Sequence, residues 1–488
     1  MTTATRASQK TKRTPVPMNG GDTPKLLATI NAMGAQPGHA THAAVTAVKT
    51  DTRQRCQRAL KMLLAQRGDS FIEVERILAD DPGCVFGHCL RTALIVRADN
   101  AARRSTVAAS VATIEAACPD IDQPARRHAT AARAWLEGNS ALAATLYSGV
   151  VVDWPHDILA LTVAHALDFH LGKPHMMRDR IAQVLPRWTA AVPGYPSILA
   201  MYAFSLEENG QYRRAEKMAR RALALDPEHA GAIHVVAHVM EMQGRAHDGL
   251  AFLAETETVW AEGTALSLHL AWHRALFYLE ASDFKSALAT YDALIASAST
   301  TDISALADGS ALLWRLQLQN IDVRERWRML ASRWEMQTLT DARSFYIVHA
   351  MSAFAAAERA AAAERLIEAL PGTDLDETSS LSPEDVIALP LCEALLAFAR
   401  SDYAACVKWL ERVRHIAHRC GGSLAQCDLI HLTFTEAALR ARKAYLACTL
   451  VAGRTAQKPA SGDACAAVMF LKLPGRRRAD ISSLSNSR

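Results

Sequence analysis

Apolar residues recur at three- and four-residue intervals through most of the chain, which places them on one face of successive α-helices. Turn residues interrupt this pattern roughly every 12–20 residues, for example at Gly138-Asn139, Asn209-Gly210 and Asp226-Pro227. No stretch sustains the alternation of apolar and polar residues that is typical of a half-buried strand. The pattern therefore predicts an all-α fold.

The helices are expected to form a regular repeat. Within residues 196–229, Ala203 and Ala215 stand where two helices would cross, Gly210 stands in the turn, and Pro227 follows the second helix. This arrangement is typical of the tetratricopeptide repeat, whose unit is about 34 residues long. The same roles recur at Ala131, Gly138, Ala143, Pro155, Ala237 and Gly244. We therefore expect a tetratricopeptide-repeat-like α-solenoid of antiparallel helix pairs with disordered termini.

The solenoid is expected to be divided by one linker. Residues 1–48 form a predicted disordered basic tail, and residues 49–373 the helical solenoid. Residues 374–383 read as an acidic linker, and residues 384–474 as C-terminal helical repeats that continue the solenoid. Residues 475–488 form a second predicted disordered basic tail.

Charge and composition argue against several classes of function. The net charge is +4, but basic residues concentrate in the two tails, so the body between them is mildly acidic. A nucleic-acid-binding domain would need a basic face, so we expect no nucleic-acid partner. The longest apolar stretch, Val386–Ala399, is too short to span a bilayer, and no signal peptide is apparent. The ten cysteines lack the spacing of zinc ligands, which favours free thiols in a cytoplasmic protein.

Several longer runs match a known family. They are Trp154-Pro155-His156-Asp157, Leu185-Pro186-Arg187-Trp188, Met201-Tyr202-Ala203-Phe204-Ser205-Leu206-Glu207-Glu208-Asn209-Gly210, Ala237-His238-Val239-Met240-Glu241-Met242-Gln243-Gly244, Trp272-His273-Arg274-Ala275-Leu276, Ser310-Ala311-Leu312-Leu313-Trp314-Arg315-Leu316 and Gly421-Gly422-Ser423. On these runs the chain resembles the tetratricopeptide repeat protein 38 family over most of residues 52–460. The resemblance implies a compact solenoid and assigns no reaction.

The chain also departs from that family's pattern. At several positions where the family tends to have particular polar residues, this chain has other ones. These positions are His229-Ala230-Gly231, Leu270, Leu424 and Cys427. The resemblance therefore implies that any chemistry of the family is degenerate in this copy.

Histidines form the main candidate site. His234 and His238 are four residues apart on a predicted helix, Glu241 follows three residues later, and His269 and His273 repeat the spacing on the next first helix. Residues four apart share a helix face, and the repeat register turns this face toward the concave groove. Three interpretations are open: hydrogen bonding between helices, a small-molecule or peptide pocket, and a metal site.

One more acidic residue belongs to the candidate groove. Glu208 is expected to hold a basic group of a partner, or else to form an ion pair with solvent-facing residues of the array.

Two functions follow from these patterns. The first is a protein- or peptide-binding module or scaffold that uses its concave surface. The alternative is a small-molecule-binding or enzymatic protein that uses a buried His/Glu cluster. The departures from the family pattern favour the binding module over an enzyme. We expect no cofactor and no metal, and the oligomeric state is left open.

Overall fold

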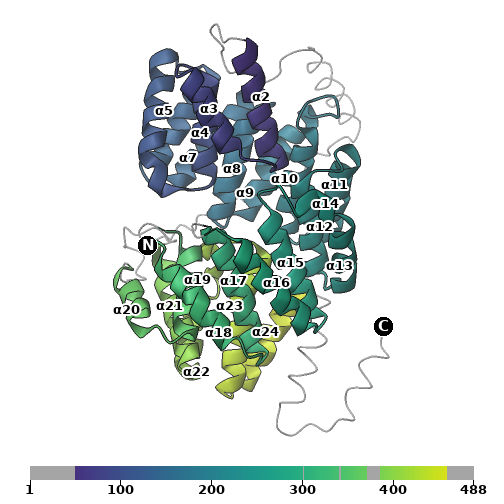
Figure 1. Cartoon of the computed structure of the whole chain (residues 1–488), viewed down its shortest axis with the longest axis vertical. Helices are drawn as coiled ribbons and strands as arrows, with labels where there is room; N and C mark the ends of the chain where they lie inside the picture. Colours follow the sequence, from purple (N-terminus) through teal and green to yellow (C-terminus); the bar gives the residue numbers. More distant parts are fainter. Residues whose placement is uncertain (1–49, 300–301, 340–341, 371–384, 459–488) are drawn as a thin grey trace, which may run out of the picture. The chain divides into compact units, whose positions relative to one another are not determined.

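The computed structural model describes residues 50–299, 302–339, 342–370 and 385–458. These residues form helices and connecting turns, with no strand among them beyond an isolated bridge between Arg67 and Thr264 (Figure 1). The all-α prediction is thereby confirmed. The predicted tails, the predicted linker and residues 459–474 lie outside the described residues.

Consecutive helices of the N-terminal half form antiparallel pairs that contact one another along the chain. They are α2 (Thr50–Ala65), α3 (Ser70–Asp80), α4 (Val85–Arg97), η1 (Ala101–Arg103), α5 (Arg104–Ala117), α6 (Pro124–Leu136), α7 (Ser140–Asp153), α8 (Ile158–His170), α9 (Pro174–Val184), η2 (Leu185–Arg187), α10 (Tyr195–Glu207), α11 (Tyr212–Leu225), α12 (Ala230–Met242) and α13 (Ala246–Glu255).

The pairing continues through the C-terminal half. Its helices are α14 (Glu257–Trp260), α15 (Ser267–Glu280), α16 (Phe284–Ser297), α17 (Ile303–Leu318), α18 (Arg324–Glu335), α19 (Ser344–Ala356), α20 (Ala360–Glu368), α21 (Asp385–Ala399), α22 (Tyr403–Val413), η3 (Ala417–Cys420), α23 (Leu424–Arg440) and α24 (Ala444–Gln457). None of the described helices is long and apolar enough to cross a membrane.

The pair α10 and α11 shows how the sequence specifies one repeat. Ala215, Ala219 and Ala222 form the buried face of α11, and the charged residues of this helix lie on its other sides. Small side chains let the two helix backbones approach closely, as the spacing predicts. Gly210 closes the turn with a φ of 70°, a conformation that costs glycine little.

Two first helices, α12 and α17, are buried on nearly every side. In α12 only His234 among its residues is partly exposed, and the central residues Ala305 to Leu316 of α17 are all buried. A helix that is apolar all round requires neighbours on every face. Here the covering helix is α23, which contacts both α12 and α17.

The contact between α17 and α23 uses polar side chains inside the core. Arg315 donates to the carbonyl of Ala425 at 2.6 Å, and the indole of Trp314 donates to Thr433 at 2.9 Å. Because these bonds join residues more than 100 positions apart in sequence, they hold the last repeat against the middle of the array.

Candidate histidine site

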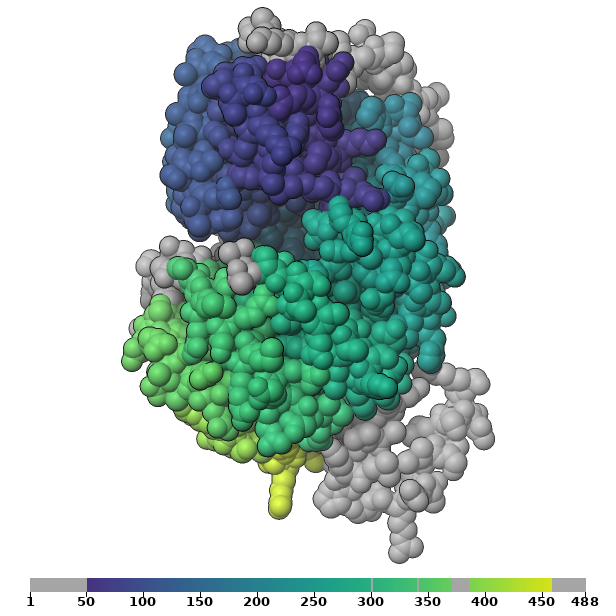
Figure 2. Space-filling model, viewed as in Figure 1, coloured from purple at the N-terminus to yellow at the C-terminus, as the bar shows by residue number. Residues whose placement is uncertain are grey.

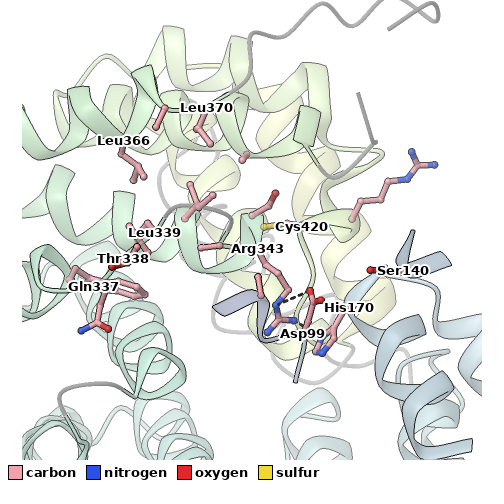
Figure 3. Close-up of a pocket in the computed structure, with 18 of the residues that line it drawn as sticks. Asp99, Ser140, His170, Gln337, Thr338, Leu339, Arg343, Leu366, Leu370 and Cys420 are labelled. Carbon is pink, nitrogen blue, oxygen red and sulfur yellow. Dashed lines mark hydrogen bonds and ion pairs between the residues drawn. The ribbon is translucent and has the colours of Figure 1, made fainter. Parts of the chain in front are cut away.

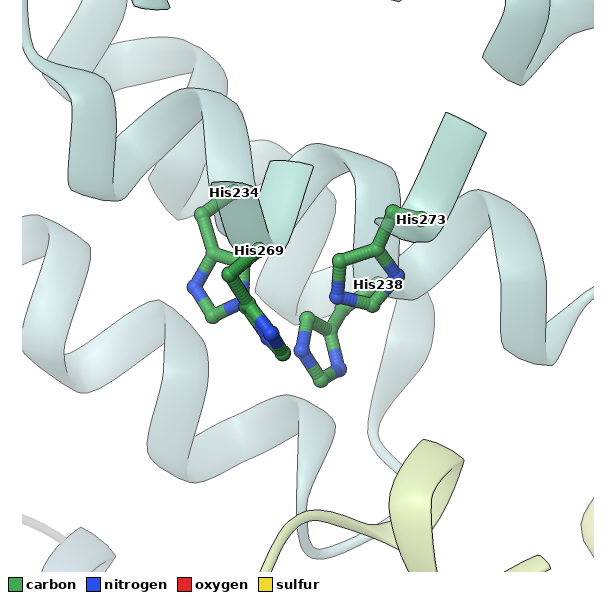
Figure 4. Close-up of side chains that lie close together, drawn as sticks. All are labelled: His234, His238, His269 and His273. Atoms are coloured by element: carbon green, nitrogen blue, oxygen red, sulfur yellow. The ribbon is translucent and has the colours of Figure 1, made fainter. Parts of the chain in front are cut away.

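Four histidines from two neighbouring first helices converge in the interior. His234 and His238 come from α12, and His269 and His273 from α15. Each offers a ring nitrogen, and these four nitrogens all lie within 4.8 Å of one another. Figure 4 shows the four rings grouped together. The four-residue spacing in each helix and the contact between α12 and α15 are the cause of this convergence.

Carboxylates from three helices lie close to the Nδ1 atoms of three of these rings. Nδ1 of His273 lies 2.9 Å from Glu241, and Nδ1 of His269 lies 2.7 Å from Asp308. Nδ1 of His238 is 3.5 Å from Glu207, within ion-pair distance. The carboxylates belong to α12, α17 and α10 respectively.

Several polar atoms of this cluster have no hydrogen-bond partner within the described part of the chain. They are Nε2 of His234, both ring nitrogens of His238, Nε2 of His273 and both carboxylate oxygens of Glu207. His238, His273 and the Glu207 side chain are completely buried. Leaving a buried polar group unpaired costs about 1–3 kcal/mol. The cluster is therefore costly unless something binds to it.

Burial also controls the charge of the cluster. It lowers the pKa of His238 to about 4 and that of His273 well below the ordinary value. It raises the pKa of Glu207 to about 8. Burial alone would lower the pKa of His269, but the adjacent charge of Asp308 raises it above the ordinary value.

Glu208 lies next to the cluster in a role that the sequence did not indicate. It is 8% exposed, and both of its carboxylate oxygens accept the backbone N–H of Leu424 at 3.2 Å. It thus binds the N-terminus of α23, where the helix dipole favours negative charge. That Glu208 holds a basic group of a partner stays a prediction.

The start of α23 covers the cluster. Ser423 and Gln426 form a capping box, and the Gln426 amide also donates to Asp308 at 3.1 Å. The same Asp308 orients His269. The helix that covers the predicted groove is therefore connected to the histidines by hydrogen bonds.

A cavity of about 330 Å³ adjoins the histidines. His234, His238 and His269 form part of its wall. The other lining residues are mostly apolar or neutral, and they include Leu63, Leu64, Thr162, Ser197, Ala200, Met201, Phe204, Val235 and Gln426. A cavity of this size matches the lower range of small-molecule sites, about 300–1,000 Å³.

Two basic residues complete the surroundings. Arg97 lines the cavity, and its Nε has no hydrogen-bond partner among the residues described. Lys458 is 7% exposed and places its ammonium 3.6 Å from Glu241 and 3.5 Å from Glu280.

Glu207, Asp308, Arg97 and Lys458 were not among the sequence-predicted site residues. Glu207 directly precedes the predicted Glu208 and stands 34 positions before Glu241, and Asp308 stands 35 positions after His273, so the repeat spacing was an available signal for both. Arg97 and Lys458 are far away in sequence, and no spacing connects them to the histidines.

A second, wider cavity of about 1130 Å³ lies elsewhere. It is lined from both halves of the described chain, and Figure 2 shows a hollow between the N-terminal helices, purple and blue, and the C-terminal helices, green. Arg343 lies beside Asp99 and His170 in its wall (Figure 3). The Arg343 guanidinium donates to Nδ1 of His170, and its Nε is 4.0 Å from Asp99.

The fold and the buried histidines define a helical repeat protein with an interior polar cluster. No protein-family model matches the chain. Among solved structures, the chain is similar to one in the structure of Naa15/Naa10 bound to HypK-THB, with 13% identity and a TM-score of 0.24. The match covers 84% of this chain and 64% of that chain, less than two thirds of its length. A likeness this weak carries no argument about function, and the family resemblance stays a prediction.

Proposed function

We propose that this protein binds a small anionic molecule in the cavity beside the four histidines. This is the second of the two functions predicted from the sequence, with the class of ligand made more specific. The observation that carries it is the position of Arg97, which lines this cavity and whose Nε has no hydrogen-bond partner among the described residues.

The environment of Arg97 favours an anionic ligand. Burial lowers the pKa of its guanidinium, and no acidic group contributes to that shift. A carboxylate or phosphate in the cavity would pair with this half-buried guanidinium in a bidentate manner. His165, Ser197 and Gln426 supply further polar groups on the same wall.

The cover provided by α23 supports a small ligand at this place. Ser423 and Gln426 at the start of α23 line the cavity, and Glu208 accepts the amide of the adjacent Leu424. A cavity with a few convergent polar groups is the usual form of a small-molecule site.

The test uses native mass spectrometry and thermal unfolding. The protein purified from its own cells should carry a small-molecule adduct. Acetate, succinate, inorganic phosphate and glycerol phosphate then serve as probes, and the one that resembles the adduct should raise the Tm of the wild type. Arg97→Met should abolish that rise, because the substitution removes the cation and keeps much of the apolar volume.

Arg91→Met is the matched control on the same helix. Arg91 is 3.7 Å from Glu75 and donates to Ser110 at 2.7 Å, so its charge is already paired. Its removal should leave the ligand-induced rise unchanged. The proposal is wrong if no adduct is found and none of the probes distinguishes Arg97→Met from Arg91→Met.

Binding of a protein or peptide is the second candidate function, and the wide cavity favours it. That cavity has more than three times the volume of the histidine-lined one and contains Arg104, Arg365 and Arg419. An extended acidic segment would fit such a surface. A photo-crosslinker placed at Arg365 should capture a partner in cells, whereas one at the opposite, exposed Tyr445 should not.

A further inference from the structure

We propose that His234, His238, His269 and His273 bind one divalent transition-metal ion of the zinc class through their Nε2 atoms. This inference concerns the histidines themselves and does not depend on the anionic ligand. It replaces the expectation of a metal-free protein.

The rings have the spacing that a tetrahedral site requires. A zinc–nitrogen bond of about 2.1 Å puts each ring centre about 3.2 Å from the ion, so tetrahedral ligands have ring centres about 5 Å apart. All six centre-to-centre distances among the four rings lie between 4.4 and 6.3 Å. The rings thus surround a common point, as Figure 4 shows, instead of stacking in a row.

Hydrogen bonds between helices account for only some of the ring nitrogens in the cluster. If the histidines were simply bridging helices, both nitrogens of each ring would be expected to have partners. Instead, Nε2 of His234, His238 and His273 is unpartnered among the described residues. These three atoms are buried, and each of the four histidines places one ring nitrogen within 4.8 Å of the others. Neutral imidazole nitrogens that converge without partners are the expected form of an empty ligand set.

Two of the four Nδ1 atoms, those of His269 and His273, are bound in the way that metal-ligating histidines usually are. Metal-bound imidazoles almost always donate their other N–H to a carboxylate or carbonyl, which fixes the tautomer and leaves Nε2 for the ion. Glu241 accepts from His273 at 2.9 Å, and Asp308 accepts from His269 at 2.7 Å. Glu207 is 3.5 Å from Nδ1 of His238 and is placed to do the same.

The charges near the site also fit a divalent cation. Four imidazoles are neutral ligands, so the bound ion would keep its charge of +2. Glu207, Glu241 and Asp308 lie one bond further out, each beside one of the ligand rings. A dication would therefore be placed among acidic side chains that compensate part of its charge.

The donor type selects the class of ion. Imidazole suits zinc, copper, cobalt and nickel, whereas calcium and magnesium prefer oxygen ligands. His234, His238 and His269 also line the cavity, which gives the ion a path into the site.

The experiment uses the full chain without an affinity tag. The protein is dialysed against a chelator and then titrated with Co²⁺ and, in competition, with Zn²⁺. We expect one equivalent of Co²⁺ with the visible absorption of a tetrahedral ion, and its displacement by Zn²⁺. His273→Ala should abolish this absorption. Asp308→Asn should weaken Zn²⁺ binding by about 10- to 100-fold, since it removes the group that orients His269.

His165→Ala is the control, because His165 lines the same cavity but is hydrogen-bonded to Ser205 outside the cluster. It should bind metal like the wild type. If His273→Ala does not fold, Asp308→Asn decides the question, with its folding checked by circular dichroism. The inference is overturned if the folded wild type takes up no ion, if the Co²⁺ spectrum is octahedral, or if Asp308→Asn binds as tightly as the wild type. None of these outcomes depends on Arg97, so the anionic-ligand proposal is tested separately.

Discussion

Nδ1 of His273 on α15 lies 2.9 Å from the Glu241 carboxylate on α12, and the two residues are 0% and 3% exposed. The same carboxylate is 3.6 Å from the Lys458 ammonium, which follows the end of α24. One buried acid therefore connects two neighbouring repeats in the middle of the array with the last helix. The candidate site and the attachment of the C-terminal repeats share this group.

Glu241→Gln should destabilise the protein. The amide still offers an oxygen to His273, but Lys458 loses one of its two carboxylate partners and keeps only Glu280, and weakening a buried ion pair is costly. We expect the free energy of unfolding, measured by urea denaturation, to fall by about 1–3 kcal/mol.

Glu216→Gln is the control for this substitution. Glu216 pairs with Arg220 and Arg245 on a more accessible surface, where ion pairs contribute about 0–1 kcal/mol. Equal losses for the two variants would show that the contacts of Glu241 are no stronger than surface ion pairs.

His238→Leu should separate stability from binding. Both nitrogens of His238 lack hydrogen-bond partners within the described residues, and the side chain is fully buried between Phe204 and the other rings. An apolar residue of similar size removes two unsatisfied groups, so the ligand-free protein should be as stable as the wild type or slightly more stable. Binding of Co²⁺ should be lost. A large fall in Tm without any change in Co²⁺ binding would assign His238 a purely structural role.

The periodic part of this fold could be predicted from the sequence. The spacing of Ala203, Gly210 and Ala215 predicted the pair α10 and α11, and the same spacing gave the adjacency of the first helices that carry the histidines. These features depend on residues three, four and about 34 positions apart, so a local pattern is sufficient to find them.

The environment of the histidines could not be predicted in the same way. The cover over the groove depends on a bond between Glu208 and Leu424, which are 216 residues apart. No periodicity encodes this contact, because it results from how the last repeats pack against the middle ones. Asp308, in contrast, lies one repeat beyond His273, 35 residues further along the chain, so its approach to His269 follows the repeat. The sequence therefore identified the stripe of histidines and left open whether it was exposed to a groove or enclosed.

Acid should destabilise the fold through His165. Burial and the charge of Arg97 lower the pKa of His165 to about 4, against about 6.5 in an unfolded chain. Between these two values the unfolded chain binds more protons than the folded one, so the stability is fully present above pH 6.5 and falls as the pH decreases toward 4. For this residue alone the loss between pH 7 and pH 5 should be about 2 kcal/mol.

His165→Gln tests that expectation. Glutamine stays neutral and can still bond to the Met201 carbonyl or Ser205, which His165 contacts at 3.2 and 3.1 Å. Urea denaturation at pH 7 and pH 5 should show that the variant loses about 2 kcal/mol less than the wild type. Parallel losses would mean that His165 is protonated in the folded protein near its ordinary pKa.

Close packing of α13 on α15 makes Gly249 the position where the smallest substitution should have a large effect. A Cβ atom there would lie 2.3 Å from Cζ of Phe277, which is fully buried. Gly249→Ala should therefore lower the free energy of unfolding by about 1–3 kcal/mol through overpacking, despite the higher helix propensity of alanine.

Gly453→Ala in α24 is the matched control, because nothing lies within 4 Å of its added Cβ, and it should stabilise the protein by up to about 1 kcal/mol. Combining Gly249→Ala with Phe277→Leu should cost less than the sum of the two single changes, because the smaller side chain makes room for the methyl group. Strict additivity in that double-mutant cycle, measured by urea denaturation, would contradict the direct contact between Gly249 and Phe277.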